Sequence, residues 1–226
     1  MDWEFAFRDR RELNSNTKWP VRNIDEVLLK GDISALLDIE TLRFAIIGDD
    51  NISLQTIEQI EKIITNIARY SNDNQMPVII TFLGGEFAEK VSEMAIHYGF
   101  PTIAVTDCDM ETALKQKNQN LIKKLLHAPG SGLLSQFAPK DTNGPLVSMD
   151  ALKTVVLMSD ALVIASATRT GTEVLAAEYA KSCRIPVFAI PGSPENHMTT
   201  GCNRLIRDGL AEMIIEYDEI GSHFGF

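Results

Sequence analysis

Residues 161–190 read ALVIASATRTGTEVLAAEYAKSCRIPVFAI, and this stretch decides the fold. It contains an apolar run at 161–166, a helical segment at 171–182 and a second apolar run at 186–190. Short runs that are apolar throughout, without alternation, are typical of strands buried on both faces. Two such strands joined by a helix form a right-handed parallel unit. We therefore predict a strand, a crossover helix and a parallel strand here.

The same alternation of predicted strands and helices extends over most of the chain. Further apolar runs predict strands at 43–47, 77–83, 101–106, 132–137 and 212–217. Helical spacing or composition predicts helices at 53–70, 86–98, 111–127, 149–159 and 202–208, with Ser53 as an N-cap for the first. The predicted fold class is α/β: a Rossmann-like, doubly wound, mostly parallel sheet with helices on both faces.

The first forty residues do not show this alternation of strands and helices. Residues 1–40 are expected to form an irregular segment with a short helix, packed on the main domain. Residues 41–226 are expected to form a single Rossmann-like domain, since this length at 45% hydrophobic content suffices for one core.

Charge and composition limit the possible partners. The formal net charge of -10 offers no general attraction to nucleic acid or an anionic membrane, so a polyanion would need a local basic site. No apolar run approaches the roughly 20 residues of a spanning helix, and residues 1–20 do not resemble a signal peptide. A cytoplasmic protein that does not bind membranes is expected. Three widely spaced cysteines and four scattered histidines predict neither a disulfide framework nor a metal site.

Ligands of such sheets bind where strands end and helices begin, so four loops deserve comparison. Glycine, serine and threonine in these loops let a backbone approach an anion or nucleotide. The candidate binding residues in the loops are Gly48, Gly84, Gly85, Thr170, Gly171, Thr172, Gly192 and Ser193, with Arg169, Asn203 and Arg204 inside or beside them. Asp49 and Asp50 oppose this prediction, because negative charge is unfavourable in a phosphate-binding loop.

Catalytic motifs are missing from the sequence. No GxSxG, GxGxxG or GxxxxGK[ST] pattern occurs. The loop before Glu173 resembles the GGxGTxxE loop of lysine decarboxylase-like nucleotide hydrolases, but the glutamate position of that motif is Leu175. Glu173 is therefore interpreted as a first-turn acid favoured by the helix dipole. We expect no catalytic residue and no cofactor.

Residues 159–209 resemble the DNA-processing protein A family, also called Smf. Members show SDAVVVVEA, RSGSLITA, VFAVPG and GxNxLIxxGA. Matching residues here include Ser159-Asp160, Arg169 to Thr172, Val187 to Gly192, and Gly201, Asn203, Leu205, Ile206 and Gly209. With a weaker match upstream, the resemblance covers about residues 19–211. It implies an extended Rossmann-like fold, single-stranded DNA binding, a homodimer and a non-enzymatic role in loading the RecA recombinase during transformation or repair.

The sequence departs from the family where DNA contact is concerned. The family's GSR loop is Gly48-Asp49-Asp50, and its arginine-rich RNRIIAGLSD stretch keeps only Lys153. Each lost cation removes a phosphate partner. Weak binding of single-stranded DNA is the leading hypothesis, with Arg169 and Lys153 as the main phosphate contacts.

Two other functions and a second role for Asn203 stay open. The first alternative is a sensor that holds a nucleotide or nucleotide-derived ligand at the same glycine-rich loops. The second and weaker alternative is an enzyme that acts on such a nucleotide. Asn203 has two open roles, a ligand contact or a hydrogen-bonded tie within its loop.

Overall fold

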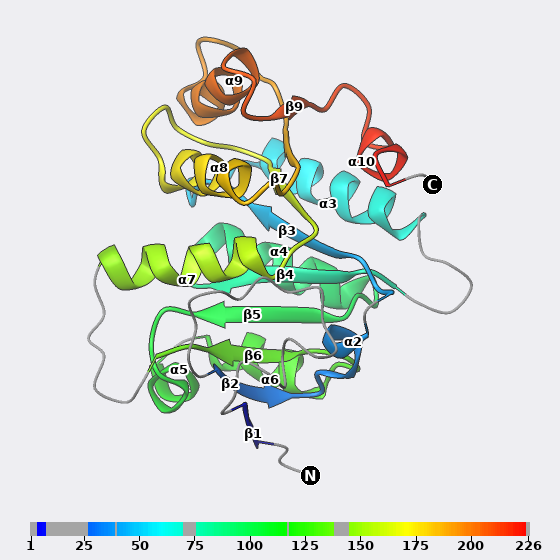
Figure 1. Ribbon diagram of the computed structural model, residues 1–226, viewed down its shortest axis with the longest axis vertical. Coiled ribbons are helices and arrows are strands. Elements are labelled where there is room, and N and C mark those ends of the chain that lie inside the picture. Colours follow the sequence, from blue (N-terminus) through cyan, green and yellow to red (C-terminus); the bar gives the residue numbers. More distant parts are fainter. Residues whose placement is uncertain are drawn as a thin grey trace.

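The computed structural model describes residues 4–7, 27–38, 40–69, 76–116, 118–137 and 145–224. Within these ranges one sheet crosses the molecule in the order β1-β2-β6-β5-β4-β3-β7-β8-β9 (Figure 1). Its strands are β1 (Glu4–Phe7), β2 (Val27–Gly31), β3 (Arg43–Ile47), β4 (Val78–Leu83), β5 (Thr102–Thr106), β6 (Gly132–Ser135), β7 (Ala161–Ile164), β8 (Val187–Ala189) and β9 (Glu212–Met213).

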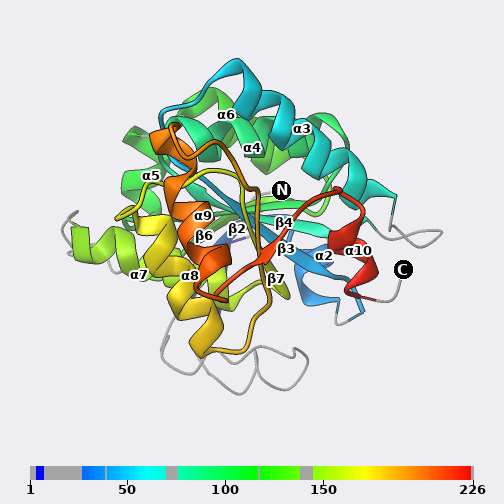
Figure 2. The same cartoon turned by 90° about the horizontal axis from the view of Figure 1, so that it is seen from above.

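Helices cover both faces of this sheet (Figure 2). They are α2 (Ser34–Leu37), α3 (Leu54–Ala68), α4 (Glu86–His97), α5 (Met110–Gln116), α6 (Gln119–His127), α7 (Pro145–Leu157), α8 (Thr172–Ser182), α9 (Thr200–Arg207) and α10 (Glu219–Ser222). The strands from β3 to β9 pair in parallel, and only β1 and β2 are antiparallel. The predicted mostly parallel, Rossmann-like α/β fold is confirmed.

Successive side chains of each strand point to opposite faces of the sheet. In β3, Phe44 and Ile46 pack with α3 and α4, whereas Ala45 and Ile47 face the core beneath α7 and α8. Since both faces are covered, every residue of β3 is buried. This explains why the strands appear in the sequence as unbroken apolar runs. The predicted N-cap of α3 is confirmed as well, because Thr56 N donates to Ser53 Oγ at 3.1 Å.

The strand order reverses at β3, and this reversal marks the candidate ligand-binding edge of the sheet. From β3 the chain proceeds outward through β4, β5 and β6, and then returns to add β7 on the other side of β3. The loops after β3 and β7 therefore diverge from neighbouring strand ends. In open α/β sheets this is the position where a crevice for ligands forms.

Three predicted elements differ from the structure. The single helix expected at 111–127 is two helices, because Asn118 Oδ1 accepts from Leu121 N at 3.2 Å and starts α6 anew. The strand expected at 212–217 pairs only over Glu212–Met213. It ends there because Ile215 N and Glu216 N donate to the Glu219 carboxylate at 2.7 and 3.2 Å. Helix α7 starts at Pro145, earlier than the predicted residue 149.

The amino-terminal region also contributes more than expected. The predicted short helix is present as α2, but Val27–Gly31 forms a strand of the main sheet, where Leu29 pairs with Leu134 of β6. The buried guanidinium of Arg43 joins this region to the sheet. Its Nη2 donates to Leu36 O at 3.3 Å and to Asp38 O at 2.9 Å, and its Nη1 lies 3.7 Å from Asp160 Oδ2. Residues 8–26 of the expected irregular segment lie outside the described ranges.

No helix in the described part of the chain combines the length and hydropathy needed to cross a membrane.

Candidate functional site

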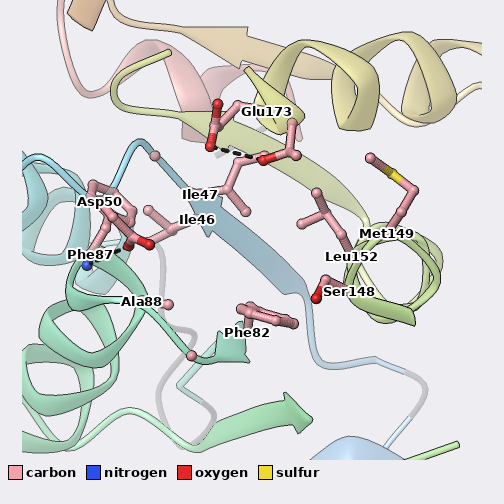
Figure 3. A pocket seen from close by; sticks show the side chains of 13 residues that line it. Ile46, Ile47, Asp50, Phe82, Phe87, Ala88, Ser148, Met149, Leu152 and Glu173 are labelled. Atoms are coloured by element: carbon pink, nitrogen blue, oxygen red, sulfur yellow. Dashed lines mark hydrogen bonds between the residues drawn. The ribbon is translucent and has the colours of Figure 1, made fainter. Parts of the chain in front are cut away.

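A cavity of about 210 Å³ lies at the carboxyl edge of the sheet, where the strand order reverses (Figure 3). Strand β3, the loop after it, the end of β4, the start of α4, α7 and the start of α8 supply its walls. The lining residues are Ile46, Ile47, Gly48, Asp50, Phe82, Gly84, Phe87, Ala88, Ser148, Met149, Leu152, Thr172 and Glu173.

The walls of the cavity differ in character. Phe82 of β4, together with Met149 and Leu152 of α7, forms the apolar wall of the cavity (Figure 3). Asp50, from the loop after β3, and Glu173, from the first turn of α8, bring carboxylates to the cavity. The arrangement is an apolar slot with two acids, which differs from the basic cradle expected for a phosphate.

Asp50 occupies the start of α4. Its Oδ1 accepts from Phe87 N at 3.1 Å, so the carboxylate binds where an anion would dock on the helix dipole. The backbone of Gly85 has φ +85°, and a Cβ there would lie 2.3 Å from both oxygens of Asp50. Gly85 thus leaves room for this carboxylate, and an incoming phosphate would have to displace it.

Glu173 lies in the first turn of α8. Its Oε1 accepts from the Thr172 hydroxyl at 3.2 Å, and its Oε2 is buried without a hydrogen-bond partner among the described residues. Burial raises the pKa of the Glu173 carboxyl, and repulsion from Asp49 and Asp50 adds to the rise in pKa. A Cβ at Gly171 would lie 2.2 Å from Oε2, so this glycine makes room for the carboxylate.

The loops after β3 and β7 are joined directly. Asp49 N donates to Ser166 Oγ at 3.0 Å, which fixes the start of one loop against the other. A Cβ at Gly48 would lie 2.5 Å from the Phe87 ring. Gly48 therefore permits the close packing of an aromatic ring on the backbone beside the cavity.

The loop of residues 190–203 is held by its own contacts. Asn203 Oδ1 accepts from Gly192 N at 3.1 Å, and Asn203 Nδ2 donates to Gly192 O at 2.8 Å. The predicted tie by Asn203 is confirmed. Ala167 N donates to Met198 O at 2.7 Å, which docks this loop on the one that precedes α8. A Cβ at Gly192 would meet the Thr199 side chain at 2.5 Å.

The candidate cationic side chains differ in whether a carboxylate of the protein already pairs with them. Arg169 is exposed, and its guanidinium makes no hydrogen bond or ion pair with the described residues. Lys153 Nζ lies 2.9 Å from Asp150 Oδ1 on the exposed side of α7. Arg204 lies 3.4 Å from a Glu178 oxygen and also donates to Arg169 O at 3.1 Å. Only Arg169 of these three lacks a carboxylate partner in the described structure.

The cavity brings together a minority of the sequence-predicted residues. Gly48, Gly84 and Thr172 line it, and Gly85 contacts it through Asp50. The remaining candidates lie outside the lining: Lys153, Arg169, Thr170, Gly171, Gly192, Ser193, Asn203 and Arg204. No group of three potential metal ligands occurs in the part of the chain that the structure describes.

Sequence reasoning missed the contribution of α7. Ser148, Met149 and Leu152 line the cavity, but the helix was expected to start at residue 149 and only Lys153 on it was assigned a ligand role. Pro145 was the available signal, since proline is common at the first position of a helix.

Comparison with known proteins agrees with the fold and with the sequence resemblance. The family model of DNA recombination-mediator protein A matches residues 24–225. The DNA processing protein DprA of Streptococcus pneumoniae is 22% identical over 241 residues, covering 100% of this chain and 82% of that protein.

Two solved structures share the fold over nearly the whole chain. The X-ray structure of DprA from S. pneumoniae has a TM-score of 0.79 at 20% identity, and the match covers 98% of this chain and 74% of that one. DNA processing protein A from Helicobacter pylori, described for its single-stranded DNA binding mode, has a TM-score of 0.77 at 18% identity. That match covers 98% of this chain and 95% of the other.

Proposed function

Since this chain belongs to the DNA recombination-mediator protein A family, we propose that it binds single-stranded DNA at the carboxyl edge of its sheet. The observation that carries the proposal is the cavity where the strand order reverses, with the unpaired guanidinium of Arg169 in the adjoining loop among the described residues. The strand's phosphates would contact Arg169 first. Lys153 on α7 and Arg204 on α9 would contribute once a phosphate competes with their carboxylate partners.

Binding is expected to be weak. The chain has a formal net charge of -10, and Asp50 and Glu173 add negative charge at the cavity itself. About three cations facing the strand predict a salt slope near -2, from ~0.7 per phosphate contact on single strands. Contacts with bases must therefore supply a large part of the affinity.

Fluorescence anisotropy with a labelled thymine oligonucleotide at several salt concentrations tests this function. We expect measurable binding with a shallow salt slope, and loss of binding when Arg169→Ala is combined with Lys153→Ala. The matched control combines Arg69→Ala with Lys181→Ala, which removes an exposed arginine and lysine at the far ends of α3 and α8.

The control pair should bind like the unaltered protein. Equal loss of affinity in both double variants would mean that binding follows only net charge. A steep slope would assign the contacts to other cations. Absence of oligonucleotide binding beside measurable binding of a mononucleotide would replace this function with the ligand-sensing alternative.

The proposal includes RecA as a partner, a homodimer and a cytoplasmic location. Exposed apolar residues support self-association, since Met213 is 45% and Ile215 is 71% exposed at the β9 edge of the sheet. Light scattering should give the mass of a dimer, and Ile215→Asp should shift it to a monomer. Biolayer interferometry with purified RecA tests the partner.

A further inference from the structure

We propose that Glu173 makes the binding of single-stranded DNA depend on pH: its neutral carboxyl permits a phosphate beside Arg169, whereas its ionised carboxylate repels that phosphate. This inference rests on the proposed function, because it adds regulation by protons to the same edge of the sheet. Three features support it: the position of Glu173, the carboxylates around it and its burial.

The Glu173 carboxylate lies against the turn that presents Arg169. This turn spans residues 168–171, and Gly171 N closes it by donating to Thr168 O at 3.2 Å. A Cβ at Gly171 would lie 2.2 Å from Glu173 Oε2 and 2.9 Å from Thr168 Oγ1, so both side chains meet the backbone of the turn. Because the Debye length is about 30 Å at 0.01 M salt, the field of this carboxylate then extends past the end of the exposed Arg169 side chain.

Two further carboxylates oppose the ionised form of Glu173. Asp49 and Asp50 follow β3, and Asp50 lines the same cavity as Glu173 (Figure 3). Asp49 N donates to Ser166 Oγ at 3.0 Å, which holds this loop against the one that precedes α8. The contact between the two loops therefore keeps like charges close together, and like charges disfavour ionisation.

Burial acts in the same direction. Glu173 Oε2 is buried without a hydrogen-bond partner among the described residues, while Oε1 accepts from the Thr172 hydroxyl at 3.2 Å. Burial is the largest cause that raises the pKa of Glu173, and repulsion from the two aspartates adds to it. The Thr172 hydroxyl and the backbone N–H of Glu173 lower the pKa but do not outweigh these causes. Glu173 thus takes up a proton at a higher pH than an ordinary glutamate does.

The other elements packed on α8 leave this balance unchanged. Cys202 of α9 has a pKa raised to about 12 by burial, so it is a neutral thiol at physiological pH. Strands β7 and β8 contribute only apolar side chains. Lys153 of α7 and Arg204 of α9 already pair with other carboxylates. Among the described residues, the charges that act on Glu173 are those of the two aspartates.

Protonation and DNA binding are coupled in both directions. A bound phosphate adds a negative charge near Glu173 and further disfavours its ionised form. Binding is therefore accompanied by proton uptake, and the affinity rises as the pH falls through the pKa of Glu173.

His197 must be removed from the comparison. Histidine also changes its charge between about pH 5 and pH 8. His197 is exposed in the loop of residues 190–203, which docks on the loop before α8 through Ala167 N and Met198 O. The experiment therefore uses His197→Gln as the parent chain.

Anisotropy titrations of a labelled thymine oligonucleotide at about 0.01 M salt, between about pH 5 and pH 8, test the inference. The parent should bind about two- to tenfold more tightly at the lower pH. Adding Glu173→Gln should give the tighter affinity at every pH. Adding Glu58→Gln, the same change at an exposed residue outside the cavity, should preserve the dependence on pH.

Calorimetric titrations in two buffers of different ionisation enthalpy measure the proton directly. The parent should take up a proton on binding DNA, at most about one per chain, and the Glu173→Gln chain should take up none. Because the first of these measurements needs only the parent, it decides the matter even where the variant folds poorly.

The outcomes separate this inference from the proposed function. Binding that does not vary with pH, a dependence on pH that survives Glu173→Gln, or binding without proton uptake overturns the role of Glu173 and leaves DNA binding intact. Failure of the parent and of Glu173→Gln to bind at every pH overturns both.

Discussion

Replacing Glu173 by glutamine should stabilise the protein at neutral pH. Burial raises the pKa of the Glu173 carboxyl above its ordinary value of 4.5, and Asp49 and Asp50 add repulsion. A folded-state pKa above the unfolded one means that the folded protein holds its proton more tightly. Stability therefore falls as the pH rises from about 4.5 through the folded pKa, and the loss is constant above that range.

The size of the effect follows from the buried charge. A buried polar group that lacks full hydrogen bonding costs about 1–3 kcal/mol, and more when it is charged; glutamine removes the charge while it preserves the shape. Because Glu173 is partly exposed, the lower end of about 1 kcal/mol is expected. For a chain of this length that corresponds to a rise in Tm of about 2–4 °C.

Thermal melting followed by circular dichroism across the acidic to neutral range measures this difference. The Tm advantage of Glu173→Gln should be largest at neutral pH and should shrink towards zero near pH 4.5, where the carboxyl is protonated. Glu58→Gln provides the control for loss of one negative charge. A lower Tm for Glu173→Gln at neutral pH, or an advantage that does not vary with pH, would refute the reasoning.

Three further substitutions test other contacts. Asp50→Ala should lower the free energy of unfolding in urea titrations by about 0.5–2 kcal/mol, because Phe87 N loses its acceptor. The same substitution should strengthen thymine-oligonucleotide binding, because it exposes the start of α4; weaker binding would contradict this account. Asn203→Ala should lower stability by about 1–3 kcal/mol through loss of both bonds to Gly192, and an unchanged Tm would show that the loop does not need them. Arg43→Met should cost about 3–5 kcal/mol in urea, because a buried guanidinium holds two carbonyls and an ion pair; a near-neutral change would contradict that role.

The parallel part of the sheet was predictable because burial leaves a local trace in the sequence. Strands such as β3 and β7 are covered on both faces, so nearly every side chain in them is apolar. The helices between them fix the direction of each crossover, which gives the parallel pairing without knowledge of any distant contact.

The edge elements were less predictable because side-chain contacts and distant strands decide them. Strand β2 is short, alternates in burial, and becomes a strand by pairing with β6. Strand β9 stops where the Glu219 side chain takes the next backbone N–H groups. The first contact lies about a hundred residues away in the chain, and the second depends on a side-chain hydrogen bond that an apolar run does not reveal.

The glycines of the candidate site show a similar limit. A glycine beside a helix start predicts that some group approaches the backbone closely, but the sequence does not tell which group. At Gly85 and Gly171 that group is a carboxylate of the chain itself, from Asp50 and Glu173. The alternation of strands and helices predicts that a ligand would bind at the carboxyl edge of the sheet, whereas the acidic and apolar lining of the cavity required the fold.

The pairing of β2 with β6 also matters while the chain is being synthesised. Leu29 leaves the ribosome roughly a hundred residues before its partner Leu134, a delay of about 5–20 seconds at ordinary elongation rates. During that interval β2 can pair only with β1, and the β3 to β5 units can assemble without it. Strand β2 is therefore translated before every parallel strand of the sheet, yet it can join them only after β3, β4 and β5 have been made and β6 has emerged.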